Sequence, residues 1–192
     1  MTYQLQRILE FHDLYPEETN FDIDMDDEET VDLIRKAKKD GVNVTCETAP
    51  HYLTMDDSFL QEDGKFKMNP PLRGKEDVEA LIQGLLDGTM TVISTDHAPH
   101  SAEEKAGSMV GAPFGIVGSE TAYALSNTVL VKERGMSPMQ LAACMSYHPA
   151  QVLGRSYELG ALKEGYYADI NVFDINALKI NATFNEPARY SE

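Results

Sequence analysis

The segment from residue 21 to residue 47 constrains the fold more than any other part of the chain. Residues 21–26 (FDIDMD) alternate apolar and acidic side chains with the period of a β-strand. A helix is predicted over Asp27–Lys39, because acids fill its first turn and bases its last, which matches the helix dipole at both ends. Gly41 ends this helix, and a second strand follows over Val42–Glu47. Such a strand–helix–strand unit is normally right-handed and parallel.

The same alternation continues along the chain. A helix is predicted over Lys75–Leu86, ended by Gly88, and a strand over Thr91–Thr95. Ser119 is predicted to cap a long helix that runs to about Arg134. Alternating strands and helices favour an α/β fold with a parallel sheet. An eight-stranded α/β barrel needs about 250 residues, so we predict either an open sheet or a piece of a barrel.

The character of the sequence changes near its end. Gly160–Gly165 is rich in turn-forming residues, and Ala168–Phe173 is predicted to form a short strand. We therefore predict an α/β unit over residues 1–155 and the start of a small β element over residues 156–192.

The charge of the chain excludes several partners. With 32 acidic and 16 basic residues, its formal net charge is −16, which disfavours nucleic acid and anionic membrane surfaces. No apolar run approaches the roughly 20 residues of a membrane span, and the first ten residues lack the apolar core of a signal peptide. Cys46 and Cys144 lie in apolar surroundings and are predicted to be buried and reduced. We expect a soluble, cytoplasmic protein.

Chemically reactive side chains gather just after the predicted strands. In parallel α/β folds, active sites form at this end of the strands. The segments concerned are Glu47–Tyr52 (ETAPHY), Lys67–Arg73 (KMNPPLR), Ile93–His100 (ISTDHAPH) and Ala112–Glu120 (APFGIVGSE).

The segment around Asp96 carries the strongest chemical signal. An apolar strand leads directly into this carboxylate, which is followed by His97, a proline and His100. A carboxylate at a strand end can ligate a divalent cation and can also move a proton from a metal-bound water. The ordinary alternative is a turn or a helix cap. The density of such residues within five positions favours a site.

Two further segments offer candidate contacts. His51 is a candidate metal ligand, a candidate substrate contact, or a packed residue that orients its loop. Pro70 and Pro71 stiffen the backbone and hold Asn69 on one side and Arg73 on the other. The amide of Asn69 can both donate to and accept from an imide or ureide edge. The alternative for this segment is an ordinary rigid loop.

The remaining candidates are weaker. Gly115 and Gly118 permit close backbone approach to a ligand and precede a helix N-terminus, which favours an anion. His12 and His148 are predicted to have surface or capping roles. The acidic residues within 22–29 are explained by strand alternation and by first-turn acids, without a cation site.

The four segments, in this order, resemble motifs of the dihydroorotases, a family of the cyclic amidohydrolase group. The combination of Lys67–Arg73 (KMNPPLR) with Thr95–His100 (TDHAPH) is specific, since allantoinases and dihydropyrimidinases usually carry different residues at several of these positions. The sequences at His148–Ala150 (HPA) and at Gly160–Ile170 are similar to the group's exit from a barrel into a β-sandwich. The resemblance extends over about residues 20–180.

The resemblance implies an activity and an architecture. The activity is the reversible hydrolysis of dihydroorotate to N-carbamoyl-aspartate in pyrimidine biosynthesis, with zinc as the cofactor. The architecture is a (β/α)8 barrel with metal at the carboxyl ends of its strands. Residues 1–155 would then be the C-terminal part of such a barrel, and residues 156–192 an incomplete β-sandwich segment.

The resemblance also implies roles for individual residues. Asp96 would be the final metal ligand and the catalytic acid/base, which takes a proton from the attacking water and returns it to the leaving ring nitrogen. Asn69 and His100 would contact the substrate, and the backbone at Phe114 and Gly115 would hold the pyrimidine edge.

Part of the family's ligand set has no counterpart in this sequence. The first-strand His-x-His pair, the bridging lysine or aspartate, and the histidine from the middle of the barrel are absent, and the position of a further histidine ligand falls at Asp24. A catalytic zinc needs about three protein ligands. We therefore expect a truncated product, a fragment, or one part of a split enzyme whose companion chain supplies the N-terminal half. The alternatives are a catalytically inactive dihydroorotase-like binding protein and another cyclic amidohydrolase, such as an allantoinase or dihydropyrimidinase.

We predict that the isolated chain self-associates. An incomplete barrel leaves sheet edges unpaired and apolar helix faces uncovered, and both promote association. Size-exclusion chromatography with light scattering should show species larger than the 21.4 kDa monomer. A monomer that melts cooperatively would contradict this prediction.

Overall fold

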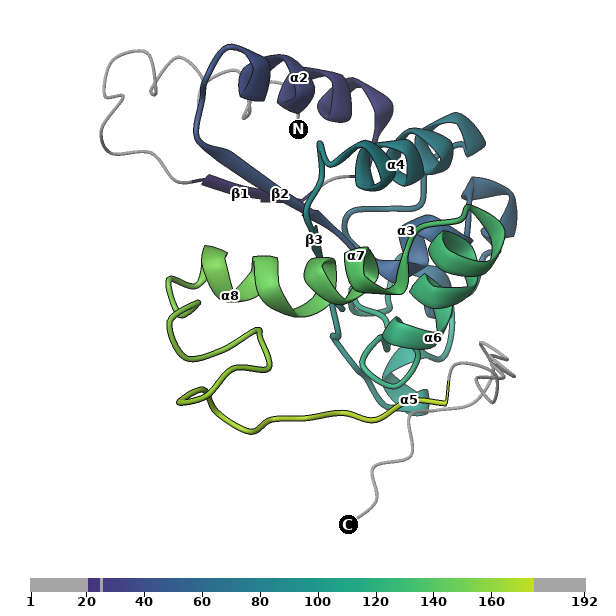
Figure 1. Ribbon diagram of the computed structural model, residues 1–192. Coiled ribbons are helices and arrows are strands. Elements are labelled where there is room, and N and C mark those ends of the chain that lie inside the picture. The colour runs from purple at the N-terminus through teal and green to yellow at the C-terminus, as the bar shows by residue number, and fades with distance from the viewer. Residues whose placement is uncertain (1–20, 25, 175–192) are drawn as a thin grey trace.

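The computed structural model describes residues 21–24 and 26–174 (Figure 1). His12 lies outside the described residues. So do residues 175–192, the last part of the predicted sandwich segment. In chain order the elements are β1 (Phe21–Asp24), α2 (Glu28–Lys39), β2 (Val44–Thr48), α3 (Pro50–Thr54), η1 (Asp57–Phe59), η2 (Gly64–Phe66), α4 (Lys75–Asp87), β3 (Val92–Ile93), α5 (Ala102–Lys105), α6 (Ala122–Ser126), η3 (Asn127–Glu133), α7 (Pro138–Ala142), η4 (Ala143–Tyr147) and α8 (His148–Val152).

The strands form a parallel sheet in the order β1-β2-β3, as the sequence predicted. Asp24 lies opposite Glu47, and Glu47 lies opposite Val92. Helix α2 contacts β2, while η4 and α8 contact β3. Figure 1 shows α2 and α4 side by side, with the continuous rod from α7 to α8 running beneath the strands. Because the strands are parallel, all their carboxyl ends lie at one edge of the sheet.

Local signals place the ends of α2 and α4 within a residue or two of the prediction. The carboxylate of Asp27 accepts a hydrogen bond from the N–H of Thr30 at 2.7 Å and so caps α2. Helix α4 ends at Gly88, whose φ of 80° lies in the left-handed region that favours glycine. The strands are shorter than predicted, and β3 contains only Val92 and Ile93.

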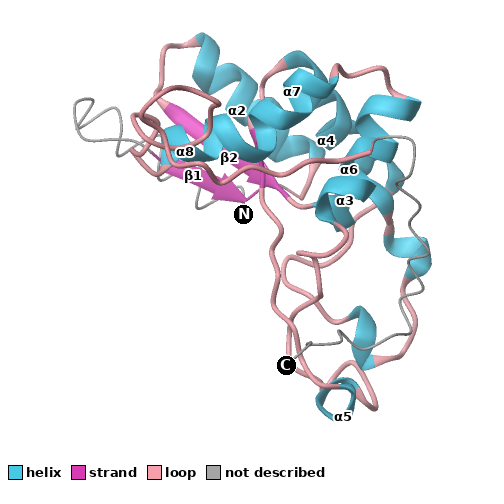
Figure 2. Ribbon diagram, turned by 60° about the horizontal axis from the view of Figure 1, so that its bottom comes forward, coloured by secondary structure: helices cyan, strands magenta, loops and turns pink. Residues whose placement is uncertain are grey.

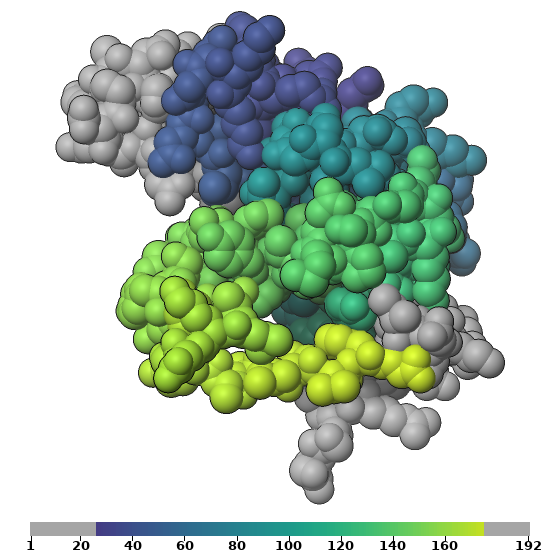
Figure 3. All heavy atoms as spheres, viewed as in Figure 1, coloured from purple at the N-terminus to yellow at the C-terminus, as the bar shows by residue number. Residues whose placement is uncertain are grey.

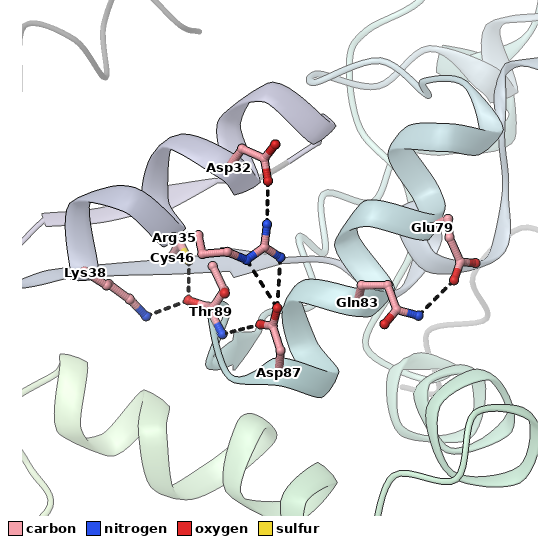
Figure 4. Close-up of polar contacts among 8 residues, drawn as sticks. All are labelled: Asp32, Arg35, Lys38, Cys46, Glu79, Gln83, Asp87 and Thr89. Atoms are coloured by element: carbon pink, nitrogen blue, oxygen red, sulfur yellow. Dashed lines mark hydrogen bonds and ion pairs between the residues drawn. The ribbon is translucent and has the colours of Figure 1, made fainter. Parts of the chain in front are cut away.

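Polar contacts fix the turn between α4 and β3 against its neighbours (Figure 4). The guanidinium of Arg35 on α2 donates to Asp87 at 2.9 Å. The carbonyl of Thr89 accepts from Lys38 Nζ at 2.6 Å and from Cys46 Sγ at 3.4 Å. These contacts surround an apolar core that joins both helices to the sheet, formed here by Val31, Ile34, Leu81, Leu85 and Met90.

The prediction that Ser119 caps a long helix is wrong. Helix α6 begins only at Ala122 and continues without a break into the π-helix η3. The backbone amides of Gly118 and Ser119 both donate to Nδ1 of His97, at 3.0 and 3.2 Å. The amides that a cap at Ser119 would bind, those of Thr121 and Ala122, donate instead to the carbonyl of Gly118 at 3.2 and 2.9 Å, and the helix starts later.

His148 has a different role from the surface or capping role predicted for it. Its Nδ1 donates to the carbonyl oxygen of Thr91 at 2.8 Å, and its side chain is partly buried. A carbonyl only accepts, so Nδ1 carries the hydrogen. His148 therefore ties the long C-terminal helical rod to the residue that precedes β3.

The predicted strand over Ala168–Phe173 does not form in the described part of the chain. These residues are exposed and have no neighbouring strand, and a strand needs such a neighbour to satisfy its backbone groups. The segment lies across one face of the molecule (Figure 3), where the ring of Phe173 stacks on that of Tyr123 at 4.1 Å between centroids.

The two faces of β2 differ in their covering. Val44, Cys46 and Thr48 are buried, whereas the alternating positions Thr45 and Glu47 remain partly exposed. A parallel strand covered on both faces is buried at every position. The described residues therefore cover one face of β2 fully and the other only in part. Among the described residues, no helix has the length and apolar character of a membrane span.

We predict that both cysteines resist labelling in the folded chain. Cys46 is fully buried and Cys144 is 5% exposed, and burial raises the pKa of the Cys144 thiol, which removes the reactive thiolate. A maleimide should react at least about tenfold more slowly with the native chain than with the chain in guanidinium, because labelling requires opening of the core. Mass spectrometry of both samples gives the measurement, and rapid native labelling would contradict the burial.

Candidate active site

The exits of β2 and β3 lie next to each other. The N–H of Ser94 donates to the carbonyl of Thr48 at 3.0 Å, which extends the pairing of the two strands by one step. Beyond this point β2 leads into α3, which carries His51, and β3 leads to Asp96. The φ of Asp96 is 47°, a left-handed conformation that few non-glycine residues adopt. Nε2 of His51 lies 3.8 Å from Oδ2 of Asp96.

His51 and Asp96 form an uncharged–charged pair. His51 is 4% exposed, and burial lowers its pKa to about 4, so the imidazole is neutral near pH 7. At 3.8 Å the contact is longer than a hydrogen bond. Nε2 of His51 is buried and makes no hydrogen bond within the described part of the chain. The carboxylate of Asp96 is 45% exposed, so one buried nitrogen and one accessible carboxylate face the same point.

The described side chains do not fit a complete zinc site. A catalytic zinc needs about three protein ligands. Within the described ranges, no group of three or more His, Cys, Asp or Glu side chains is arranged to hold a metal ion. Asp24, the weaker ligand candidate, ends β1 opposite Glu47, at the same edge of the sheet as Asp96.

The loop that carries Asn69 is anchored on both sides. The hydroxyl of Tyr52 on α3 donates to the carbonyl of Pro70 at 2.6 Å. Nε of Arg73 donates to Asp26 at 2.8 Å. Asp26 is fully buried; burial raises its pKa, and the Arg73 guanidinium offsets part of that effect. Asn69 is exposed and directly precedes the first of these anchors, Pro70.

The other predicted substrate residues lie together. Nε2 of His100 donates to the carbonyl of Phe114 at 2.9 Å. The N–H of Gly115 donates to the carbonyl of Lys67 at 3.1 Å, two residues before Asn69. The structure thus brings together the segments Lys67–Arg73, Ile93–His100 and Ala112–Glu120. The fourth segment, Glu47–Tyr52, reaches them through the contacts of Tyr52 with Pro70 and of His51 with Asp96.

Gly118 has a close contact with its own chain on the side where a Cβ would stand, and approach of a ligand to it remains a prediction. A Cβ at Gly118 would lie 2.3 Å from the carbonyl oxygen of Thr95, so the chain itself occupies the space next to this glycine. The same holds on one side of Gly115, where a Cβ would lie 2.4 Å from the carbonyl oxygen of Ala98. Both glycines let the loop pack against the segment that follows β3.

Two residues of this region escaped the sequence analysis. Asp26 was assigned to regular strand alternation, yet it is the buried partner of Arg73. Lys105 was not singled out, yet its ammonium group contacts both loops of the candidate site. Neither residue stands in a spacing that signals its partner: Asp26 binds Arg73, 47 positions away, and Lys105 joins Lys67, 38 positions away, to the nearby Pro113 and Gly115.

The sequence of this chain is similar to known hydrolases. The profile of the amidohydrolase family matches residues 9–190. The dihydroorotase of Lactobacillus gasseri is 53% identical over 148 residues, which are 76% of this chain and 35% of that protein. The dihydroorotase of Bacillus cereus is 52% identical over 147 residues, which are 76% of this chain and 34% of that protein. The chain therefore spans about a third of the length of these relatives.

Solved structures give a consistent result for the fold. An L-hydantoinase (dihydropyrimidinase) from Arthrobacter aurescens matches with a TM-score of 0.76 at 27% identity, over 85% of this chain and 37% of that one. A D-hydantoinase from Bacillus sp. AR9 matches with a TM-score of 0.74 at 26% identity, over the same shares of the two chains.

We predict that Gly115→Ala loosens the candidate site, whereas Gly111→Ala does not. The left-handed φ of 137° at Gly115 and the 2.4 Å approach to Ala98 disfavour any Cβ there. Strain of this kind costs about 1–3 kcal/mol. Gly111 lies in the same loop with open space around it. Hydrogen exchange at the Ala98 amide, which donates to Ile116, measures the effect; equal exchange in both variants would contradict the prediction.

Proposed function

Because the chain belongs to the amidohydrolase family, we propose that it contributes to dihydroorotase catalysis, the reversible hydrolysis of dihydroorotate to N-carbamoyl-aspartate in pyrimidine biosynthesis. The observation that carries this proposal is that the KMNPPLR and TDHAPH segments lie together at the carboxyl edge of a parallel sheet. The loop at Gly115 and Ile116 links them, because Gly115 donates to Lys67 and Ile116 accepts from Ala98. Identity of more than 50% to dihydroorotases over this region supports the choice of substrate.

The proposal assigns the proton transfer to Asp96. Its carboxylate is accessible and lies 3.8 Å from His51 at the carboxyl edge of the sheet, a position suited to a general acid/base. It takes a proton from the attacking water and later gives that proton to the ring nitrogen as the amide bond breaks. Asn69 pairs with the ureide edge through its amide, and His100 with the backbone of Phe114 and Gly115 holds the other side of the ring.

We propose zinc as the metal of the assembled enzyme, with Asp96 as one ligand and Asp24 as a weaker candidate. Nε2 of His51 lies 3.8 Å from the Asp96 carboxylate, and no group of three or more ligating side chains forms among the described residues. The remaining ligands therefore belong to residues outside the described ranges or to another chain. The proton transfer assigned to Asp96 does not depend on how these ligands are supplied.

We also propose that residues 1–155 form the C-terminal part of a (β/α)8 barrel and residues 156–192 the start of a β-sandwich. The partly open face of β2 supports this, because the inner face of a barrel is completed by strands from around the ring. The rest of the barrel is supplied by further residues of the same polypeptide, by a companion chain, or by self-association. We also propose a cytoplasmic protein, and the net charge of −16 disfavours binding to nucleic acid and to anionic membranes.

We predict that the chain with added zinc is inactive alone and gains turnover when mixed with the N-terminal remainder of the Lactobacillus gasseri dihydroorotase. In that mixture Asp96→Asn should lower kcat by about 100- to 10,000-fold, the usual contribution of a general acid/base. Asp169→Asn, at an exposed position far along the chain, should leave it unchanged. Chromatographic detection of N-carbamoyl-aspartate gives the measurement.

Three outcomes would overturn parts of this proposal. Turnover retained in Asp96→Asn would remove the role of Asp96. Opening of hydantoin or dihydrouracil without dihydroorotate turnover would favour a dihydropyrimidinase, in line with the solved hydantoinases. A well-folded mixture that turns over none of these substrates would favour a binding protein without catalysis.

A further inference from the structure

The ammonium group of Lys105 lies among three backbone carbonyls. Nζ donates to Lys67 at 2.9 Å, to Pro113 at 3.0 Å and to Gly115 at 2.8 Å. An ammonium group has three N–H donors and no acceptor, so these contacts use its full capacity. The arrangement is specific to a compact point donor, since the planar guanidinium of arginine directs its donors differently.

The position of Lys105 makes this contact unexpected. Lys105 ends α5, which lies away from the sheet among the loops (Figure 2). A lysine on a short surface helix normally extends into water, and Lys105 instead folds back and is partly buried. Burial lowers its pKa, and the nearby charge of Lys67 lowers it further, while Asp63 acts in the opposite direction. Its three acceptors are neutral carbonyls, so hydrogen-bond geometry holds the side chain in place.

The three carbonyls belong to the two loops of the candidate site. Lys67 stands two residues before Asn69, and Pro113 and Gly115 flank Phe114. The carbonyl of Lys67 accepts twice, from Lys105 and from the N–H of Gly115 at 3.1 Å. The two loops therefore meet at the carbonyl oxygen of Lys67. The ammonium group of Lys105 bonds to this oxygen and to the carbonyls of Pro113 and Gly115 on the other loop.

Other contacts in this region are weaker or more exposed. Nζ of Lys67 donates to the carbonyl of Val110 at 3.0 Å and lies 4.6 Å from the ring centroid of Phe114, at the surface. The hydrogen bond from His100 to Phe114 reaches one of the two loops only. The hydrogen bonds of Lys105 thus span both loops and use all of its donors.

We propose that Lys105 is a positioning residue of the active site, which sets the spacing between Asn69 and the Phe114–Gly115 backbone through its three carbonyl contacts. The effect of Lys105 on substrate binding rests on the proposed function, because Asn69 and the Phe114–Gly115 backbone are the contacts proposed for the substrate ring. Lys105 itself does not touch the substrate. Loss of its donors lets the two loops separate, which weakens substrate binding more than it slows the chemical step.

The first experiment measures amide hydrogen exchange by NMR in Lys105→Met and needs neither substrate nor metal. Methionine keeps most of the side-chain length and removes the donors. Exchange at Gly115 should become at least about tenfold faster, because its hydrogen bond to Lys67 loses support. Exchange at Ser94, which donates to Thr48 between the strands, should not change. Faster exchange at both amides would indicate general destabilisation and overturn the proposal, as would no change at Gly115.

Two controls separate the hydrogen bonds from charge and from bulk. Lys65→Met removes a lysine of the neighbouring turn, whose Nζ lies 3.5 Å from Asp63 at the surface, and should leave Gly115 unchanged. In Lys105→Ala, added propylammonium should restore protection at Gly115, because it replaces the missing atoms together with their donors. Tetramethylammonium carries the same charge without N–H groups and should not. Equal effects of the two ions would overturn the role of the donors.

The substrate readout uses the reconstituted enzyme. Lys105→Met should raise KM for dihydroorotate about tenfold with a smaller change in kcat, the pattern expected when ground-state contacts are lost. If exchange changes as expected and no form of the enzyme turns over dihydroorotate, the positioning role stands and the proposed function fails. If turnover occurs and KM and exchange stay unchanged, the function stands and the role of Lys105 fails.

Discussion

The parallel pairing of β2 with its two neighbours is the constraint on which the rest of the structure depends. The register sets Asp24 beside Glu47 and Glu47 beside Val92, so the chain leaves every strand at one edge. The bond from Ser94 to Thr48 carries this pairing past the last residue of β3. His51 and Asp96 come within 3.8 Å because each follows its strand by only a few residues. A register shift of one residue would turn every side chain of a strand to the opposite face and separate them.

Much of this frame could be predicted from the sequence, because its signals are local. Asp27 and the first-turn acids define the start of α2, and Gly88 defines the end of α4. The prediction failed where the local signal does not decide which groups the backbone bonds to. Ser119 has the chemistry of a helix cap, but the amides of Thr121 and Ala122 that it would bind donate to the carbonyl of Gly118. The run from Ala168 to Phe173 has strand propensity, but among the described residues no partner strand lies beside it.

The candidate site shows the same division between local and distant causes. The sequence identified Asp96, Asn69, His100 and the Phe114–Gly115 turn as a group, because reactive residues cluster after strands, and the structure joins the segments that carry them. Their catalytic and binding roles remain predictions that the experiments above address. The sequence did not identify Asp26 or Lys105. Each makes a contact with a segment 38 or more positions away, and Lys105 joins that segment to its own neighbourhood; no spacing rule encodes such a contact.

The loops of the site are held largely by side chains that donate to backbone carbonyls. Tyr52 binds the carbonyl of Pro70, His100 that of Phe114, and Lys105 those on both loops. Loop backbone has no sheet or helix ladder to satisfy its polar groups, so buried carbonyls need such donors. The motif residues therefore define the chemistry, while Tyr52 and Lys105, which lie outside KMNPPLR and TDHAPH, help to define the geometry. A relative that keeps both motifs but lacks Tyr52 and Lys105 would retain the reactive groups and lose part of their alignment. Misplacement of about 1 Å can lower the rate about 100-fold.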